Sequence, residues 1–166
     1  MRVRALVLSD THIARGGRLA LPQAVLDAAV SADVVVHAGD LVGADVLETL
    51  SQLAPVHAVL GNNDHELVGR LPTSVEFDLG GVPIAVVHDS GPTEGRPSRM
   101  ARMFPTAGLV VYGHSHQPFD GPGVNGQWLL NPGSPTQRRR APTHTFAWIE
   151  AGGGQPLQTR LVHLGP

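Results

Sequence analysis

The sequence predicts a mixed α/β fold, and two observations along the chain support that prediction. The first 64 residues alternate apolar, strand-like runs with helix-like runs in the order strand, helix, strand, helix, strand. Such an alternation is typical of a parallel sheet with right-handed crossovers. Hairpin signals dominate the second half, namely Gly80-Gly81 and the three glycines at 152–154. We therefore expect antiparallel hairpins beside a parallel unit.

Apolar periodicity and turn residues give the expected elements in order. Strands are expected at residues 2–9, 33–37, 56–60, 74–79, 82–87, 108–112, 127–130, 143–151 and 155–164. Helices are expected at residues 22–30, 44–54 and 96–104. Pro22 suits the first turn of a helix, and Pro55 ends the second helix. No repeat or linker interrupts this series, so residues 1–166 are expected to form one domain.

The composition excludes several classes of function. The chain has no cysteine, and all twelve of its basic residues are arginine, so thiolate ligands, cysteine nucleophiles and Schiff-base lysines are absent. The net charge of −2 gives no support to nucleic acid as the main partner. No segment has the length of a membrane span, so we expect a cytoplasmic protein without a membrane partner. A homo-oligomer is left open.

Polar side chains follow the expected strands at the points where ligands bind in open α/β sheets. The seven groups are Asp10, His12, Asp40, Asn62, His88, His114 and His116. They offer oxygen and nitrogen donors without sulfur, which suits hard-to-borderline divalent metals. Seven donors exceed the needs of one ion. Two ions that share a carboxylate, about 3.5–4 Å apart, would use them well, and such pairs recur in phosphatases and nucleases.

These segments resemble the motif series of the calcineurin-like metallophosphoesterases. In chain order the matching segments are Asp10-Thr11-His12, Gly39-Asp40, Gly61-Asn62-Asn63-Asp64, His88 and Gly113-His114-Ser115-His116. The small size and the segment Asn131-Pro132-Gly133-Ser134 resemble the compact bacterial and archaeal YfcE-like phosphodiesterases. The resemblance runs from residue 9 to residue 134. It implies a four-layer αββα sandwich, in which two mixed β-sheets are flanked by helices.

The resemblance also implies a role for each donor. One metal ion is expected on Asp10, His12 and His116, a second on Asn62, His88 and His114, with Asp40 as the bridge. Mn²⁺, Fe, Zn²⁺ and Ni²⁺ all suit these donors, and the sequence does not choose among them. Metal-bound water, with its pKa brought toward 7, would attack the phosphorus of a small phosphodiester or activated phosphate ester.

Two departures from the family pattern bear on catalysis and specificity. Larger family members carry a histidine, thought to assist the leaving group, where this chain has Asn63. Asparagine cannot be a general acid near pH 7, so we hypothesise a preference for phosphodiesters or esters with good leaving groups. The small phosphodiesterases also lack that histidine. Many relatives have glycine after the motif histidine, whereas Asp89 follows His88 here, so a substrate role for Asp89 is only a candidate.

Other polar residues near the motifs have weaker assignments. Arg138, Arg139 and Arg140 follow the Asn-Pro-Gly-Ser segment and are candidates to clamp a phosphate, with a solvated loop as the equal alternative. His37 is interpreted as a buried histidine that supports the ligands. Asp64 is expected to orient the asparagine loop through hydrogen bonds.

The competing hypothesis is a protein without catalytic activity. The eukaryotic retromer subunit that shares this fold binds partner proteins through its surface and has lost part of the histidine set. Retention of all seven ligand types favours the enzyme over such a scaffold, because a metal-ligand cluster of this kind has no evident use in a scaffold.

Overall fold

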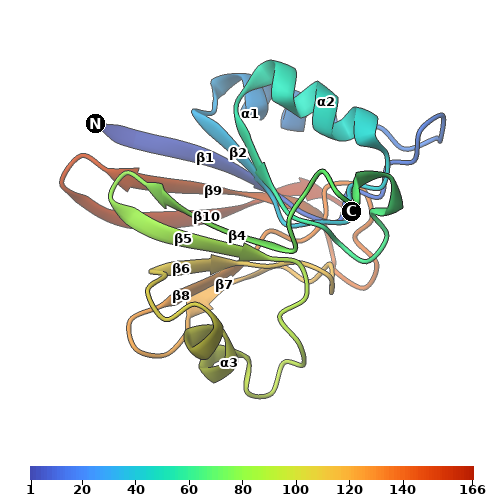
Figure 1. The fold of residues 1–166 in the computed structure, drawn as a ribbon. Coiled ribbons are helices and arrows are strands. Elements are labelled where there is room, and N and C mark those ends of the chain that lie inside the picture. The colour runs from blue at the N-terminus through green and yellow to red at the C-terminus, as the bar shows by residue number, and fades with distance from the viewer.

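The computed structural model describes residues 1–166 and contains two five-stranded sheets (Figure 1). The first sheet has the order β10-β9-β1-β2-β3, with bounds Gln155–Gly165, His144–Gly152, Arg2–Leu8, Val34–His37 and Val56–Ala58. The second has the order β4-β5-β6-β8-β7, with bounds Ser74–Leu79, Val82–Val87, Leu109–Val111, Trp128–Asn131 and Phe119–Pro122.

Both sheets are mixed. Strands β1, β2 and β3 are parallel, which confirms the parallel unit predicted for the first 64 residues, and β9 and β10 extend that sheet in antiparallel fashion. In the second sheet β5, β6 and β8 are parallel, and β4 and β7 are the antiparallel edges. The two predicted hairpins are β4–β5 and β9–β10.

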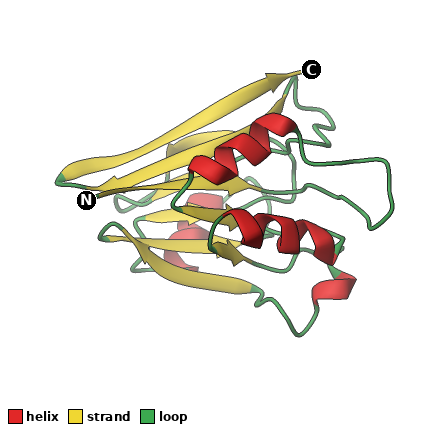
Figure 2. Cartoon of the chain, turned by 90° about the horizontal axis from the view of Figure 1, so that it is seen from above, coloured by secondary structure: helices red, strands yellow, loops and turns green.

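The layers follow the αββα order implied by the resemblance. Helices α1 (Gln23–Ser31) and α2 (Ala44–Leu53) cover the outer face of the first sheet, and α3 (Arg96–Met103) covers that of the second (Figures 1 and 2). Val46 and Leu50, four residues apart on α2, are buried against the first sheet. A separate apolar core, which includes Val36 and Val86, lies between the sheets. The ends of the central strands are therefore positioned by apolar cores on both faces of the sheet.

Two elements were missed by the sequence-based prediction. Strand β7 and the short 3₁₀ helix His65–Leu67 lie in segments expected to be loops. Strand β7 contains Gly121 and Pro122, which disfavour interior strands, but it is an edge strand where proline is tolerated. The bounds of the other elements agree with the prediction to within two residues.

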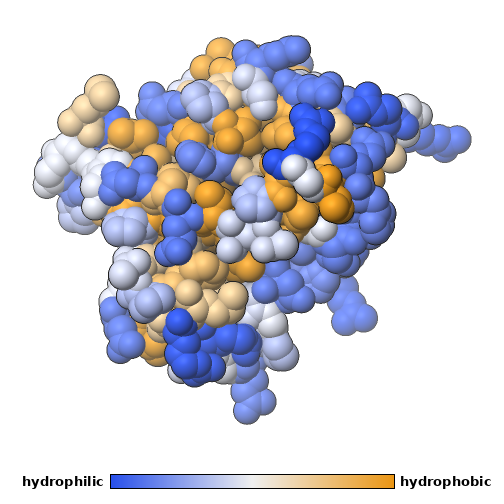
Figure 3. Space-filling view, in the orientation of Figure 1, coloured by the Kyte–Doolittle hydropathy of each residue, from blue (hydrophilic) through white to orange (hydrophobic).

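The surface is mixed in character. Hydrophilic residues form much of the rim of the face seen in Figure 3, and hydrophobic residues are visible across its middle. Large hydrophobic side chains exposed elsewhere, such as Leu19, Val68 and Met103, are scattered along the chain. None of the helices has the length and apolar character that a membrane crossing requires.

Candidate metal centre

The polar segments that follow the strands meet at one end of the sandwich. In the first sheet the amide of Asp10 donates to the carbonyl of Gly39 at 2.9 Å. In the second, the amide of Gly113 donates to the carbonyl of His88 at 3.0 Å. The two sheets are joined directly, because the amide of His114 donates to Oδ2 of Asp10 at 2.9 Å. Segments about a hundred residues apart in the chain therefore share one site.

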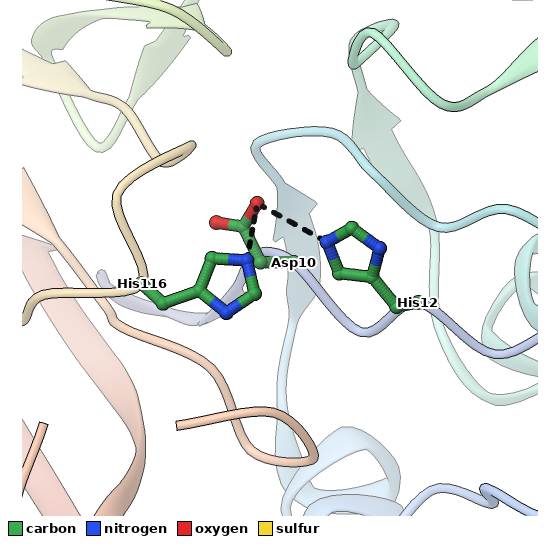
Figure 4. A group of neighbouring side chains, drawn as sticks. All are labelled: Asp10, His12 and His116. Atoms are coloured by element: carbon green, nitrogen blue, oxygen red, sulfur yellow. Dashed lines mark ion pairs between the residues drawn. The ribbon is translucent and has the colours of Figure 1, made fainter. Parts of the chain in front are cut away.

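Asp10 lies between two imidazoles (Figure 4). Its Oδ1 is 3.8 Å from Nε2 of His12 and 3.5 Å from Nε2 of His116. All three of these atoms are buried and have no hydrogen-bond partner. Each buried polar atom without a partner destabilises the folded protein by about 1–3 kcal/mol. Three such atoms facing one another therefore indicate a binding site for a cation or another partner. Their types, one carboxylate oxygen and two imidazole nitrogens, fit a divalent transition metal.

Asp40 lies between a second pair of imidazoles. Its Oδ2 is 3.3 Å from Nε2 of His12 and 3.4 Å from Nε2 of His88. Asn63 donates to the same carboxylate through its backbone amide, to Oδ1, and through its side chain, to Oδ2, both at 2.9 Å. Burial alone would raise the pKa of Asp40, but the contacts with His88 and Asn63 hold it well below its usual value. Asp40 is therefore an anion placed between two groups of donors.

Backbone carbonyls orient two of the histidines. Nδ1 of His88 lies 2.7 Å from the carbonyl oxygen of Ala38, and Nδ1 of His116 hydrogen-bonds the carbonyl of Gln137. A carbonyl can only accept, so each Nδ1 carries the proton and each Nε2 faces the cluster. Burial lowers the pKa of His116, and the nearby charge of Arg139 acts in the same direction. This tautomer is the one that binds a metal through Nε2.

Asn62 and His114 occupy the open side of the cluster. Oδ1 of Asn62 is 3.1 Å from Nε2 of His88, and the ring centroids of His114 and His88 are 5.2 Å apart. Both Asn62 and His114 are exposed, whereas Asp10, Asp40 and His116 are buried. The structure thus brings all seven predicted ligands into one neighbourhood, with solvent access at the Asn62 and His114 side.

Five of the seven lie in a backbone conformation that the sequence did not indicate. The φ angles are 55° at Asp10, 48° at His12, 59° at Asp40, 74° at His114 and 61° at His116. Asp10 and His12 therefore do not continue the extended backbone of β1. Left-handed residues other than glycine are uncommon and are enriched at functional sites, where surrounding contacts impose them.

The supporting contacts come from residues distant in sequence. Ser9 donates to Oδ2 of Asp10 at 2.7 Å, which leaves Oδ1 for the cluster. Ser134 donates to the carbonyl of Asp10 at 2.7 Å, and Thr136 donates to that of Thr11 at 2.6 Å. Sequence reasoning missed these roles. The segment Asn131-Pro132-Gly133-Ser134 had signalled the family, but no local pattern reveals a partner more than a hundred residues away.

His37 is a further supporting residue, and it is fully buried beneath the cluster. Its Nδ1 accepts from the amide of Gly39, so Nε2 carries the proton and donates to Oγ1 of Thr11 at 3.1 Å. Burial lowers the pKa of His37 to about 3, so the ring is neutral. The interpretation of His37 as a buried supporting histidine is confirmed.

Close packing at Gly113 gives a first testable prediction. A Cβ at this position would lie 2.0 Å from Oγ of Ser9 and 2.7 Å from Oδ2 of Asp10. Gly113→Ala is therefore expected to lower the free energy of unfolding by about 2 kcal/mol, measured by urea denaturation. In the double variant Ser9→Ala/Gly113→Ala the nearest obstacle is gone, and the loss should be less than the sum of the single losses. Additive losses would contradict the steric explanation.

None of the substrate-binding candidates forms a hydrogen bond or an ion pair with a predicted ligand. Arg138 donates to the carbonyls of Arg139 and Ala141 in its own loop. Arg139 and Arg140 are exposed and line a pocket beside the cluster. Asp89 is exposed and accepts from the amide of Gly91, which forms a tight local turn.

The fold and the cluster together define a metallophosphoesterase architecture, and sequence comparison identifies the family. A model of the calcineurin-like phosphoesterase superfamily domain matches residues 1–154. The chain belongs to that superfamily.

Individual relatives agree with this assignment. A probable metallophosphoesterase of Methanothermobacter thermautotrophicus is 36% identical over 161 residues, which cover 96% of this chain and 91% of the relative. One from Methanocaldococcus jannaschii is 34% identical over 136 residues, which cover 80% and 68%. A solution structure of a Thermotoga maritima protein has a TM-score of 0.74 at 28% identity and covers 98% of this chain and 99% of that one.

The fold also matches solved structures of Vps29. Vps29 from Entamoeba histolytica, solved in complex with Zn²⁺, has a TM-score of 0.75 at 22% identity, with 96% of this chain and 98% of that chain covered. At this identity the likeness concerns the fold alone.

Proposed function

We propose that this protein is a dinuclear metal-dependent phosphodiesterase that hydrolyses small phosphodiesters or activated phosphate esters. The observation that carries the proposal is the group formed by Asp10, His12 and His116, whose inward-facing atoms are buried and unpaired. Membership of the calcineurin-like phosphoesterase superfamily supports phosphate esters as the substrate class.

The donor set suits two cations that share Asp40. Asp10, His12 and His116 would hold one, and Asn62, His88 and His114 would hold the other. The position of Asp40, within 3.4 Å of both His12 and His88, supports its assignment as the bridge. Divalent ions at such a site activate water near neutral pH and neutralise charge on phosphoryl oxygens. Mn²⁺, Fe²⁺, Zn²⁺ and Ni²⁺ are all candidates, and the Zn²⁺ complex of the Entamoeba histolytica protein makes Zn²⁺ worth testing first.

The protein's own contribution is to position these donors before substrate arrives. The carbonyls of Ala38 and Gln137 hold His88 and His116 with Nε2 facing inward. Ser9 and the amide of His114 occupy Oδ2 of Asp10 and so direct Oδ1 into the cluster. Because these groups are fixed in advance, little reorganisation accompanies the reaction, which is the main source of electrostatic catalysis.

Metal dependence tests the proposal directly. Protein stripped with a chelator should not hydrolyse bis(p-nitrophenyl) phosphate, and adding one of the four metals should raise the rate by about 10²-fold or more. The same metals with heat-denatured protein serve as the control. Absence of hydrolysis with Mn²⁺, Zn²⁺, Fe²⁺ and Ni²⁺ alike would rule out the enzyme.

Asn63 sets the expected dependence on the leaving group. Its side chain hydrogen-bonds Asp40 and has no proton to give near pH 7. In a series of aryl phosphodiesters, log(kcat/KM) should therefore fall steeply as the pKa of the leaving phenol rises. Asn63→His places an imidazole at this position and should make the slope shallower. A slope near zero in the wild-type protein would contradict the hypothesis.

A scaffold without catalytic activity is the second candidate, and the fold that this chain shares with Vps29 is compatible with it. The two functions differ in one measurement. A scaffold that binds metal retains its metal content after purification but shows no metal-dependent hydrolysis. The enzyme retains metal and also hydrolyses the substrate.

A further inference from the structure

A polar pocket lies beside the ligand cluster, and its lining includes none of the seven ligands. Its lining residues come from two segments of the chain, Ser115 and Gln117 from one and Arg139 and Arg140 from the other. We propose that this pocket binds a second anionic group of the substrate, a phosphate or carboxylate, while the reacting phosphate lies at the cluster. The inference rests on the proposed phosphoesterase function and extends it to a substrate class.

Both segments are attached to residues of the cluster. Ser115 lies between His114 and His116 in the chain, and Gln117 follows directly. In the segment that carries the arginines, the backbone carbonyl of Gln137, two residues before Arg139, accepts the Nδ1 hydrogen bond of His116. The pocket is therefore within reach of one small molecule that also contacts the exposed side of the cluster.

The side chains of the two arginines of the pocket have no partner within the chain. Neither guanidinium forms a salt bridge or a hydrogen bond within the chain, whereas Arg15 and Arg70 pair with Glu66 and Glu48. Arg138, the first of the three candidates, is engaged with carbonyls of its own loop. The geometry thus separates Arg139 and Arg140 from Arg138 as anion-binding residues.

The loop that carries the arginines is firmly anchored. Oγ of Ser134 accepts from the amides of Thr136 and Gln137, at 3.2 and 2.8 Å, while donating to the carbonyl of Asp10. The amide of Ala141 closes the loop by donating to the carbonyl of Arg138 at 2.9 Å. Arg139 itself adopts φ 50°, a conformation that such a closed loop imposes. Anchored arginines lose less freedom on binding than arginines on a loose segment.

The chemistry of the lining selects an anion. None of the four residues is hydrophobic or acidic, so the pocket offers neither an apolar surface nor a cation site. The hydroxyl of Ser115 accepts from the amide of Gln117 and from the side chain of Asn131, which leaves its hydrogen free to donate. Two guanidinium groups with added neutral donors are typical of phosphate and carboxylate recognition.

Two substrates that differ only in a second phosphate test the proposal. They are thymidine 5′-(p-nitrophenyl phosphate) and the same compound with a 3′-phosphate, which release the same phenolate. For the metal-loaded wild-type protein, kcat/KM should be at least tenfold higher for the bisphosphorylated compound. The ratio should approach one in Arg139→Asn/Arg140→Gln, where asparagine is chosen because it tolerates positive φ. Arg102→Gln/Arg160→Gln removes two charges from exposed positions away from the pocket and should keep the wild-type ratio.

A binding measurement separates failure of the pocket from failure of the enzyme. Calorimetric titration of the metal-free proteins with inorganic pyrophosphate should give measurable binding for the wild type and for the Arg102/Arg160 control. Affinity should fall at least tenfold in the Arg139/Arg140 variant. Equal affinity in all three proteins, or no binding to any, would overturn the pocket even if hydrolysis is observed. Binding that depends on the two arginines without any hydrolysis would uphold the pocket and overturn the phosphodiesterase.

Discussion

Asp40→Asn is expected to reduce metal-dependent hydrolysis of bis(p-nitrophenyl) phosphate by about 10³-fold in kcat/KM. The substitution preserves the size of the side chain but removes the negative charge that lies 3.3 Å from His12 and 3.4 Å from His88. Without that charge the proposed bridge between the two groups of donors is lost. Metal content, measured by mass spectrometry of the purified protein, should fall by at least one ion per chain.

Asp27→Asn is the matched control for this variant. Asp27 is an exposed carboxylate on α1 that accepts only from the side chain of Gln23, so activity and metal content should not change. If Asp40→Asn retained the wild-type metal content and an activity within tenfold of the wild type, Asp40 would not be the bridge. Circular dichroism of both variants would establish that the fold is intact.

Asp64→Ala is expected to lower the free energy of unfolding by about 3–5 kcal/mol, because three backbone amides lose their acceptor. Oδ2 of Asp64 accepts from the amides of Asp40 and Gly61, at 2.8 and 2.7 Å, and Oδ1 accepts from the amide of Val42 at 2.7 Å. Asp64 is itself only 2% exposed, so water does not readily replace it. Urea-induced unfolding measures the loss.

Asp64→Asn gives an intermediate case. Its single carbonyl oxygen can serve the amides of Asp40 and Gly61, while its NH₂ group faces the amide of Val42, so the loss should be smaller than for alanine. Asp89→Ala is the control, because Asp89 is exposed and serves one amide in its own turn; its effect should be within about 0.5 kcal/mol. Similar losses for Asp64→Ala and Asp89→Ala would contradict the special role of Asp64.

The role of Asp64 was predicted correctly from the sequence, because it depends only on residues that are neighbours in the chain. An aspartate after Gly61-Asn62-Asn63 is typical of a turn in which the side chain binds nearby amides, and the structure confirms this arrangement. The strands and helices were predicted correctly for the same reason, because the periodicity of apolar residues is a property of neighbouring residues in the chain. Strand β7 failed because Phe119–Pro122 carries no such pattern and pairs with β8 through tertiary context.

The gathering of donors within each sheet was predictable, because parallel strands of one sheet end at a common edge. That the two edges meet, through the amide of His114 and Oδ2 of Asp10, is seen only in the structure. The second layer of contacts around the donors was not predictable either. The bond from Ser134 to the carbonyl of Asp10 joins residues 124 positions apart, and Gln137 orients His116 through a backbone carbonyl that any residue type supplies. Such contacts leave no trace in composition or spacing. The left-handed backbone at His12 likewise has no local signature, because histidine also occurs widely in ordinary backbone conformations and its neighbours do not distinguish the two cases.

That backbone has a consequence for how this chain can change over evolutionary time. Each non-glycine residue in the left-handed region costs roughly 1 kcal/mol relative to glycine, and the centre holds five of them. Substitution by glycine or asparagine at these positions would relieve the penalty, so the proposed metal binding is what would retain the present residues there. A descendant released from catalysis could therefore become more stable by losing its ligands. Glycine or asparagine at these five positions would therefore identify, from sequence alone, a relative that has lost the proposed activity.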